Sequence, residues 1–260
     1  MRAGTVITYH GVGDVPRLRD PYRLVLPTEK FEEQMAFLAR ARTVVPLADL
    51  LAGSWTGSKP AVAITFDDGY RCVLDVAEPI LQKHGFTAVC FVPSKWIGAR
   101  NAWDEFDDAA APLEVMDEGE LREAERRGIA IESHGRSHMH LDQLSPQEVY
   151  DDLRESAERL QKVVGRRPRY LAYPYGAHTP AVREAARRAG FEVAFSIGRP
   201  GEGTFAHERV TIRREEGTRI YAFKTSGRYL AWRYSRVGAA GYSAIRPLVR
   251  RRRNAVGAAS

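Results

Sequence analysis

The chain has 260 residues, of which 44% are hydrophobic, and a formal net charge of +6. These values allow a large buried core and exclude a mainly disordered chain. The two cysteines, Cys72 and Cys90, are too few for a disulfide framework and are expected to pack as small apolar residues. No apolar run is long enough to span a bilayer, and the first residues lack the pattern of a secretory signal. We therefore expect a cytoplasmic protein.

Short β-rich runs alternate with stretches of helical periodicity along the chain. Strands are expected at residues 5–9, 61–66, 87–92, 129–133, 170–173, 192–196 and 209–213. Helices are expected at 28–42, from the turn at 67–69 to His84 with Gly85 as the C-cap, and at 117–128, 145–164 and 180–189, with a capping box that starts at Ser145. Repeated βα units predict parallel pairing, either in an open doubly wound sheet or in a closed barrel.

The positions of the reactive side chains favour the barrel. His10, Asp67, Asp68, His134 and Tyr175 each follow the end of a predicted strand. In a parallel barrel all of these strand ends lie on one rim, which is where such folds carry their active sites. Residues far apart in the sequence are therefore expected to converge there.

The positive charge is concentrated at the end of the chain. From Arg228 onward there is no acidic residue, and a run of arginines at 250–253 follows several aromatic residues. We divide the chain there, into a barrel domain at 1–227 and a basic, aromatic-containing tail at 228–260. Three roles for the tail remain open, in decreasing order of preference: a solvated tail, an anchor to an anionic membrane surface at the inner face of the membrane, and a nucleic-acid arm. The rest of the chain has no recognised nucleic-acid module, which makes the arm the weakest of the three.

Two adjacent carboxylates, Asp67 and Asp68, directly follow an apolar strand, and Gly69 lets the backbone turn sharply. Consecutive side chains point in different directions, so one carboxylate can bind a metal ion while the other acts as a general base on a water molecule. The alternative is an Asx-turn or a helix N-cap, which explains most Asp-Gly pairs that follow a strand.

His134 and His138 are four positions apart, a spacing that lets two imidazoles on one helical turn share a metal ion. The alternative is a pair of surface histidines in a polar loop. With Asp68 as a third ligand the pair predicts one divalent ion with open coordination positions, as in catalytic zinc sites. Zinc is the first choice, and cobalt or nickel would suit the same donors. His140 lies near the pair but does not continue the spacing.

These motifs resemble those of a known family. The segments TFDDG at 65–69 and AYPYG at 172–176 bracket the histidine pair, and this order is similar to that of the NodB-type polysaccharide deacetylases, carbohydrate esterase family 4. The resemblance implies an irregular (β/α)7 barrel that hydrolyses acetyl groups on an N-acetylated sugar. It also implies Asp67 as the general base, Asp68, His134 and His138 as metal ligands, and the backbone N–H of Tyr175 as an oxyanion donor.

The resemblance has one departure. Many family members carry an arginine, followed by two prolines, at the start of the third motif, where it helps to orient the base. Here Ala172 and Tyr173 occupy the first two positions. A sub-branch that resembles the poly-N-acetylglucosamine deacetylases of biofilms also lacks this arginine and has a Tyr-His pair near its start, a pattern that Tyr9 and His10 match.

Expulsion of an amine requires a proton, and we interpret His10 as the general acid, with His207 as the rival. The alternative for His10 is a buried histidine at the barrel rim. Trp103 and Asp104, in a long loop, are candidates for stacking on a sugar ring and for binding its hydroxyls, and Tyr173 is a third candidate for substrate contact. The tryptophan could equally pack the loop onto the barrel.

Two other functions compete with sugar deacetylation. The same centre can cleave other C–N bonds, so the chain could be a metal-dependent amidohydrolase on a small molecule. A catalytically silent carbohydrate-binding module on the same fold is the second alternative. Asp67 would be dispensable in such a module, and its presence favours an enzyme.

Overall fold

The computed structural model describes residues 4–103, 112–198 and 203–235. Its strands are β1 (Gly4–Tyr9), β2 (Gly11–Val12), β3 (Val25–Leu26), β4 (Thr43–Val44), β5 (Ala61–Phe66), β6 (Ala88–Val92), β7 (Ile129–Ser133), β8 (Tyr170–Ala172), β9 (Val193–Ile197) and β10 (His207–Thr211). Its α-helices are α1 (Thr28–Ala41), α2 (Leu47–Ala52), α3 (Glu78–Lys83), α4 (Glu118–Arg126), α5 (Pro146–Val164), α6 (Pro180–Arg188), α7 (Thr218–Lys224) and α8 (Tyr229–Arg233).

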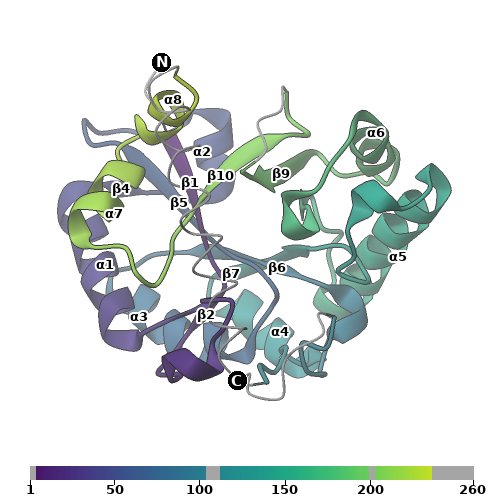
Figure 1. The fold of residues 1–260 in the computed structure, drawn as a ribbon, viewed down its shortest axis with the longest axis horizontal. Coiled ribbons are helices and arrows are strands. Elements are labelled where there is room, and N and C mark those ends of the chain that lie inside the picture. The colour runs from purple at the N-terminus through teal and green to yellow at the C-terminus, as the bar shows by residue number, and fades with distance from the viewer. Residues whose placement is uncertain (1–3, 104–111, 199–202, 236–260) are drawn as a thin grey trace, which may run out of the picture.

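Seven parallel strands close into a barrel in the order β1-β10-β9-β8-β7-β6-β5, and β5 returns to β1. The closing pair is in register over its whole length, from Gly4 opposite Ala61 to Tyr9 opposite Phe66. The short β4 adds to β5 outside this ring. Figure 1 shows the helices arranged around the strands. The prediction of a seven-stranded (β/α) barrel is confirmed.

Both faces of the barrel wall are apolar, as expected for parallel strands that are covered by helices. One cluster of buried side chains, including Phe91, Ala172 and Phe195, comes from several strands. A larger cluster joins the strands to the helices, with Phe31, Met35 and Leu38 contributed by α1. The barrel therefore has a packed core and no open pore.

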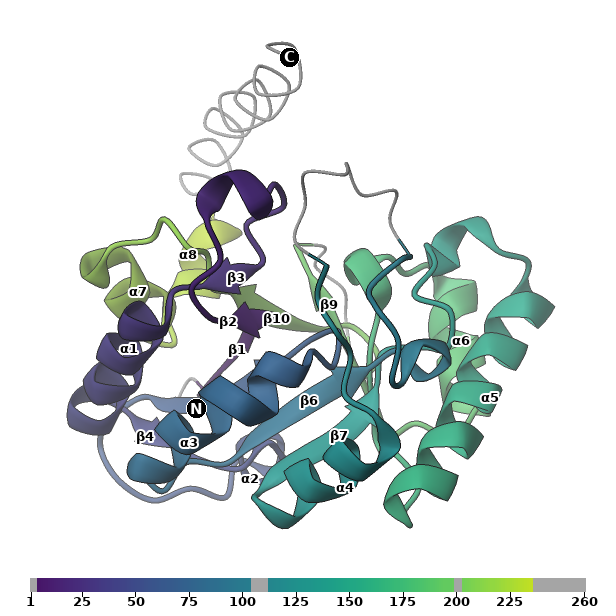
Figure 2. The same cartoon turned by 90° about the horizontal axis from the view of Figure 1, so that it is seen from below.

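Local signals set the helix boundaries. Ser145 and Asp117 each form the predicted kind of N-cap, with a capping box to Glu148 and Glu120 respectively. Figure 2 shows α5 lying beside α6, and the two helices share a buried apolar cluster. The helix predicted to end near Gly85 begins as a π-helical segment, Val73–Ala77, before α3. Pro79 is the second residue of α3 and directly follows the π-helical segment and Glu78.

Several short elements were not predicted, namely β2, β3, β4, α2, α7 and α8. Strands of two residues and helices of five to seven are too short to show a hydrophobic period. The last of them, α8, lies inside the predicted tail and packs against α7 through Trp232 and Phe223, whose ring centroids are 5.4 Å apart. Among the described residues no helix combines the length and the hydropathy that a membrane crossing requires.

Candidate metal centre

Three buried side chains from two strand ends converge at the barrel rim. The carboxylate of Asp68 and the imidazoles of His134 and His138 each offer one ligand atom, and these atoms lie within 4.8 Å of one another. The Oδ1 atom of Asp68 is 3.5 Å from Nε2 of His134 and 3.2 Å from Nε2 of His138. The three residues predicted as ligands are therefore brought together with their donor atoms facing a common point.

The ring of His134 is oriented by the backbone. Its Nδ1 lies 2.8 Å from the carbonyl oxygen of Ala172, so Nδ1 carries the proton and Nε2 presents its lone pair toward Asp68. Burial lowers the pKa of His134 to about 4 despite the neighbouring carboxylates. The imidazole is consequently neutral at physiological pH, which is the form that binds metal ions.

A buried carboxylate holds the loop between the two histidines. Asp152, on α5, accepts hydrogen bonds from the backbone N–H groups of Arg136, at 2.7 Å, and Ser137, at 3.0 Å. The hydroxyl of Ser137 donates to the same carboxylate. Because these bonds join α5 to the loop, they place His138 over the end of β7. Asp152 was not predicted as part of the site, because it lies in an ordinary amphipathic helical pattern.

The centre concentrates backbone strain. Asp68, His138 and Tyr175 are three of the four non-glycine residues with positive φ in the described chain, at 71°, 61° and 58°. Such residues cost about 1–3 kcal/mol each and persist where surrounding contacts require them. Gly176, at φ 67°, has no room for a side chain, because a Cβ there would lie 2.4 Å from the carbonyl oxygen of Ile197. The turn that carries Tyr175 thus packs directly on β9.

Asp67, the predicted general base, forms a buried ion pair with Arg209 of β10. The two guanidinium nitrogens of Arg209 lie 2.6 and 2.9 Å from the two carboxylate oxygens of Asp67. The Arg209 side chain is 0% exposed and that of Asp67 is 2% exposed. Burial raises the pKa of Asp67, but Arg209, His134 and His10 together lower it below its ordinary value. Asp67 is therefore ionised at neutral pH.

Arg209, like Asp152, was not predicted from the sequence. It also donates to the hydroxyls of Thr8 and Thr65, at 3.3 and 3.2 Å, and its guanidinium lies over the ring of Phe91. The missing arginine of the third motif is thus replaced by one from a different strand. The one sequence signal that could have indicated Arg209 is a charged residue at an inward-facing position of the predicted strand at 209–213.

The structure separates the two candidates for the general acid. His10 directly follows β1 and lies close enough to Asp67 and Asp68 to lower the pKa of both carboxylates. His207 begins β10, at the end of the strand that is opposite to the rim, and its ring packs 5.4 Å from that of Phe195. Burial lowers the pKa of His207. The placement favours His10.

Aromatic rings pack around the candidate metal ligands. The ring centroid of Trp103 is 4.5 Å from that of His138, and Tyr175 lies 4.9 Å from the same imidazole on another side. Trp96 packs edge-on against Trp103 at 5.5 Å, and its indole N–H donates to the carbonyl of Ser137. Trp103 is partly buried. It packs against His138, as expected if it holds the loop onto the barrel, and it also lies beside the centre, where a sugar ring could stack on it.

The other two predicted sugar contacts differ in their placement. Tyr173 is only 1% exposed, and its hydroxyl donates to the carbonyl of Phe205 at 3.0 Å. Its side chain is therefore a core residue with no surface for a sugar. Its neighbour Tyr175 turns back to the centre because its backbone is left-handed. Asp104 lies outside the described residues.

Residues 55–194 match the family model described as Polysaccharide deacetylase. The YxkH protein of Bacillus subtilis, named as a candidate polysaccharide deacetylase, is 26% identical over 216 residues, which cover 80% of this chain and 70% of that protein. The poly-beta-1,6-N-acetyl-D-glucosamine N-deacetylase of Staphylococcus aureus strain MRSA252 is 25% identical over 200 residues, which cover 70% of this chain and 66% of that protein.

Two solved structures share the fold. The Streptococcus pyogenes deacetylase PplD in complex with acetate has a TM-score of 0.71 at 20% identity, over 86% of this chain and 98% of that one. IcaB from Ammonifex degensii has a TM-score of 0.68 at 24% identity, with the same coverage of 86% and 98%. The family match spans more than half of the sequence and includes Asp67, Asp68, His134, His138 and Tyr175, and the chain belongs to the NodB-type polysaccharide deacetylase family.

Proposed function

We propose that this chain hydrolyses the acetamide of an N-acetylated sugar, releasing acetate and a free amine. The observation that carries the proposal is the pairing of an ionised, buried Asp67 with a cluster of three metal-ligating side chains next to it in sequence and in space. A binding module would gain nothing from a buried carboxylate that is held ionised beside such a cluster. The sugar specificity is suggested by the relatives, one of which is named for poly-beta-1,6-N-acetyl-D-glucosamine.

The residues of the centre fit one divalent metal ion. Two imidazole nitrogens and one carboxylate oxygen are the donor set of many catalytic zinc sites, and cobalt or nickel accept the same donors. Asp68 is ionised as required, because hydrogen bonding from His138 and the nearby histidines overcome burial and hold its pKa well below the ordinary value. An ion held by Asp68, His134 and His138 would polarise the acetyl carbonyl and lower the pKa of a water molecule.

Asp67 then has the position of the general base. Its carboxylate accepts two hydrogen bonds from Arg209, and two of its roughly four lone-pair sites remain for a water molecule. The water would transfer a proton to Asp67 while its oxygen forms a bond to the acetyl carbon. Arg209 orients Asp67 and keeps it ionised, so we regard Arg209 as a positioning residue.

Collapse of the tetrahedral intermediate breaks the C–N bond and requires a proton on the leaving nitrogen. We assign this proton to His10, which lies near both carboxylates of the centre. The backbone N–H of Tyr175 is the proposed hydrogen-bond donor to the oxyanion, since its left-handed turn lies against His138.

A small-molecule amidohydrolase is the nearest rival, and the silent carbohydrate-binding module is the other. Acetate release from N-acetylglucosamine oligomers separates all three. We expect turnover by the zinc-loaded chain and its loss after chelation, with recovery on adding zinc back, because the three-ligand site supplies the Lewis acid. His138→Ala should behave as the chelated protein does and should bind less than one zinc ion per chain.

His84→Ala is the matched control, because His84 follows α3 and packs on Phe86 away from the centre. It should retain both zinc and turnover. Acetate release that survives both chelation and His138→Ala would refute the proposed centre. Hydrolysis of small acetamides with none of the sugar oligomers would instead favour the amidohydrolase.

We propose further that the end of the barrel and the basic tail attach to an anionic membrane surface. Ile220 on α7 and Trp232 on α8 are 51% and 42% exposed, and Phe223 of α7 packs against Trp232. Ile220 and Phe223 precede the segment from Arg228 onward, which has arginines and no acidic residue, and Trp232 lies within it. Exposed aromatic residues beside basic residues are the combination that binds the interface of anionic bilayers.

Sedimentation with lipid vesicles tests this attachment. The full chain should bind vesicles that contain phosphatidylglycerol and should bind pure phosphatidylcholine vesicles more weakly. Combined Ile220→Ser and Trp232→Ala substitutions should weaken binding roughly tenfold, which corresponds to about 1.4 kcal/mol of lost apolar burial. Leu18→Ser is the control, since Leu18 is 85% exposed elsewhere on the molecule. Equal binding by both vesicle types would contradict the proposal.

A further inference from the structure

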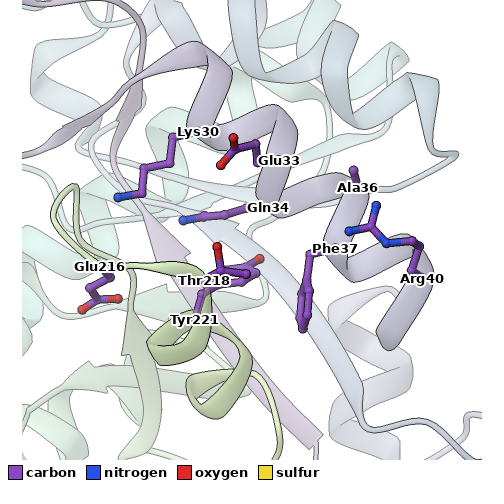
Figure 3. Close-up of a pocket in the computed structure, with 9 residues that line it drawn as sticks. All are labelled: Lys30, Glu33, Gln34, Ala36, Phe37, Arg40, Glu216, Thr218 and Tyr221. Carbon is purple, nitrogen blue, oxygen red and sulfur yellow. The ribbon is translucent and has the colours of Figure 1, made fainter.

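A hollow lies outside the barrel wall, between α1 and the segment that leads from β10 into α7. It has a volume of about 330 Å³. Figure 3 shows Lys30 and Gln34 extending from α1 toward the side that carries Glu216, with Phe37 and Tyr221 nearby. None of the residues of the metal centre lines it, so this hollow is distinct from the candidate active site.

Two buried polar atoms at this hollow have no partner among the described residues. One is Nε2 of Gln34, a hydrogen-bond donor, and the other is Oε2 of Glu216, an acceptor. Gln34 is 5% exposed, and the side chain of Glu216 is 12% exposed. Leaving such groups unpaired costs about 1–3 kcal/mol each, so buried polar atoms of this kind usually have a ligand or a water molecule as partner.

The other polar atom of each side chain already accepts a hydrogen bond. The hydroxyl of Tyr9 donates to Oε1 of Gln34 at 2.7 Å, which fixes the amide so that Nε2 is left over. The buried ammonium of Lys224 donates to Oε1 of Glu216 and to the carbonyl of Thr211. The free donor and the free acceptor are therefore held in place before any ligand arrives.

The lining also defines the chemical class of the ligand. Lys30 and Arg40 balance Glu33 and Glu216 in charge, which favours a neutral molecule. The half-buried ring of Phe37 supplies an apolar wall and is braced edge-on by Tyr221, at 5.7 Å between centroids. A neutral ligand that accepts from Gln34, donates to Glu216 and presents an apolar face to an aromatic ring has the chemistry of a sugar unit, whose hydroxyl and acetamide groups both donate and accept.

We propose that this hollow is an accessory binding site for one neutral sugar unit, separate from the catalytic centre. Its volume lies at the lower end of the roughly 300–1,000 Å³ that is common for small-molecule sites, so it suits a single ring. It would give a polymeric substrate a second attachment to the protein, which raises the effective concentration of the polymer at the centre. The identity of the sugar as part of the substrate rests on the proposed function, whereas the existence of the site does not.

The test uses binding rather than turnover, on the full chain with Asp67→Asn, which slows consumption of the substrate. The probe is the N-acetylglucosamine trimer, and the readout is the NMR signal of the Gln34 side-chain amide in 15N-labelled protein. Gln34→Glu identifies that signal, because glutamate keeps the oxygen that accepts from Tyr9 and lacks the N–H groups. We expect the Gln34 amide to shift in a saturable way as the trimer is added.

Two tryptophan substitutions on α1 provide the matched comparison. Ala36 lines the hollow, whereas Ala39 lies exposed on the same helix and does not line it. Ala36→Trp should fill the hollow and raise the dissociation constant at the Gln34 signal at least tenfold, about 1.4 kcal/mol, while Ala39→Trp leaves it unchanged. An unmoved Gln34 amide at millimolar trimer, or equal shifts in both tryptophan variants, would overturn the site. Acetate release is measured in a separate experiment. Failure of the binding test would therefore refute the accessory site without refuting the proposed deacetylase activity, and the reverse also holds.

Discussion

Arg209→Met is expected to destabilise the protein and to impair turnover at the same time. The substitution leaves the carboxylate of Asp67 buried without its partner, and breaking a buried ion pair in this way costs about 3–5 kcal/mol of unfolding free energy. Urea denaturation of the metal-free protein measures this loss. Arg209→Lys should recover part of the stability, since an ammonium keeps the charge but cannot donate to both carboxylate oxygens.

The pH dependence of turnover separates positioning from simple destabilisation. Arg209 lowers the pKa of Asp67, so its removal raises that pKa. Because the general base must be ionised, the acidic limb of kcat/KM is expected to move to higher pH in Arg209→Met, measured on the folded protein. A purely structural arginine would lower the folded fraction and leave the limb where it is.

The exposed pair of Arg169 and Glu192 is a control with the same geometry. Two nitrogens of Arg169 lie 2.8 and 2.7 Å from the two carboxylate oxygens of Glu192, but both side chains are about half exposed. Arg169→Met should therefore cost no more than about 1 kcal/mol and leave turnover intact. Equal costs for Arg169→Met and Arg209→Met would show that burial of the Asp67 pair has no special role.

Asp67→Asn is expected to reduce kcat by about 10²–10⁴-fold, the usual contribution of a positioned general base. Asparagine has nearly the same shape but cannot accept a proton from water at neutral pH. Zinc binding should persist, at one ion per chain, because the proposed ligands are Asp68, His134 and His138. This combination of retained metal and lost turnover distinguishes Asp67→Asn from His138→Ala, in which both are lost.

Asp75→Asn is the control, because Asp75 is exposed in the π-helical segment that follows. It should keep full turnover. If Asp67→Asn retained most of its activity at equal zinc content and equal folded fraction, Asp67 would not be the base. Loss of zinc in this variant would instead make Asp67 a ligand and would require the roles of the two carboxylates to be reassigned.

A large part of the centre could be predicted from local sequence. Asp67 and Asp68 follow an apolar strand, His134 follows another and His138 is four residues further on. Strand ends, capping residues and short motifs are properties of single segments. They can therefore be predicted without knowing which other segment of the chain they contact. For the same reason the helix that starts after Ser145 and the parallel strands were predicted with nearly correct bounds.

Contacts between distant segments could not be predicted in this way. Asp67 and Arg209 are 142 residues apart and meet only because β10 pairs with β1 when the barrel closes. Asp152 reaches the loop between the histidines from α5, and Gln34 and Glu216 come together across the space between α1 and α7. The local sequence around each of these residues does not predict which distant residue it contacts.

There is a physical reason why some features could be predicted from local sequence and others could not. The order of βα units, the rim on which the reactive residues gather and the three candidate metal ligands follow from hydrophobic periodicity and from spacing along single segments. Folding brings Arg209 against Asp67 and places His10 rather than His207 at the rim. It also buries Tyr173 and puts Tyr175 at the centre. Those outcomes depend on barrel closure, on strand direction and on the left-handed backbone at Tyr175, each of which is set by packing between segments that are far apart in the chain.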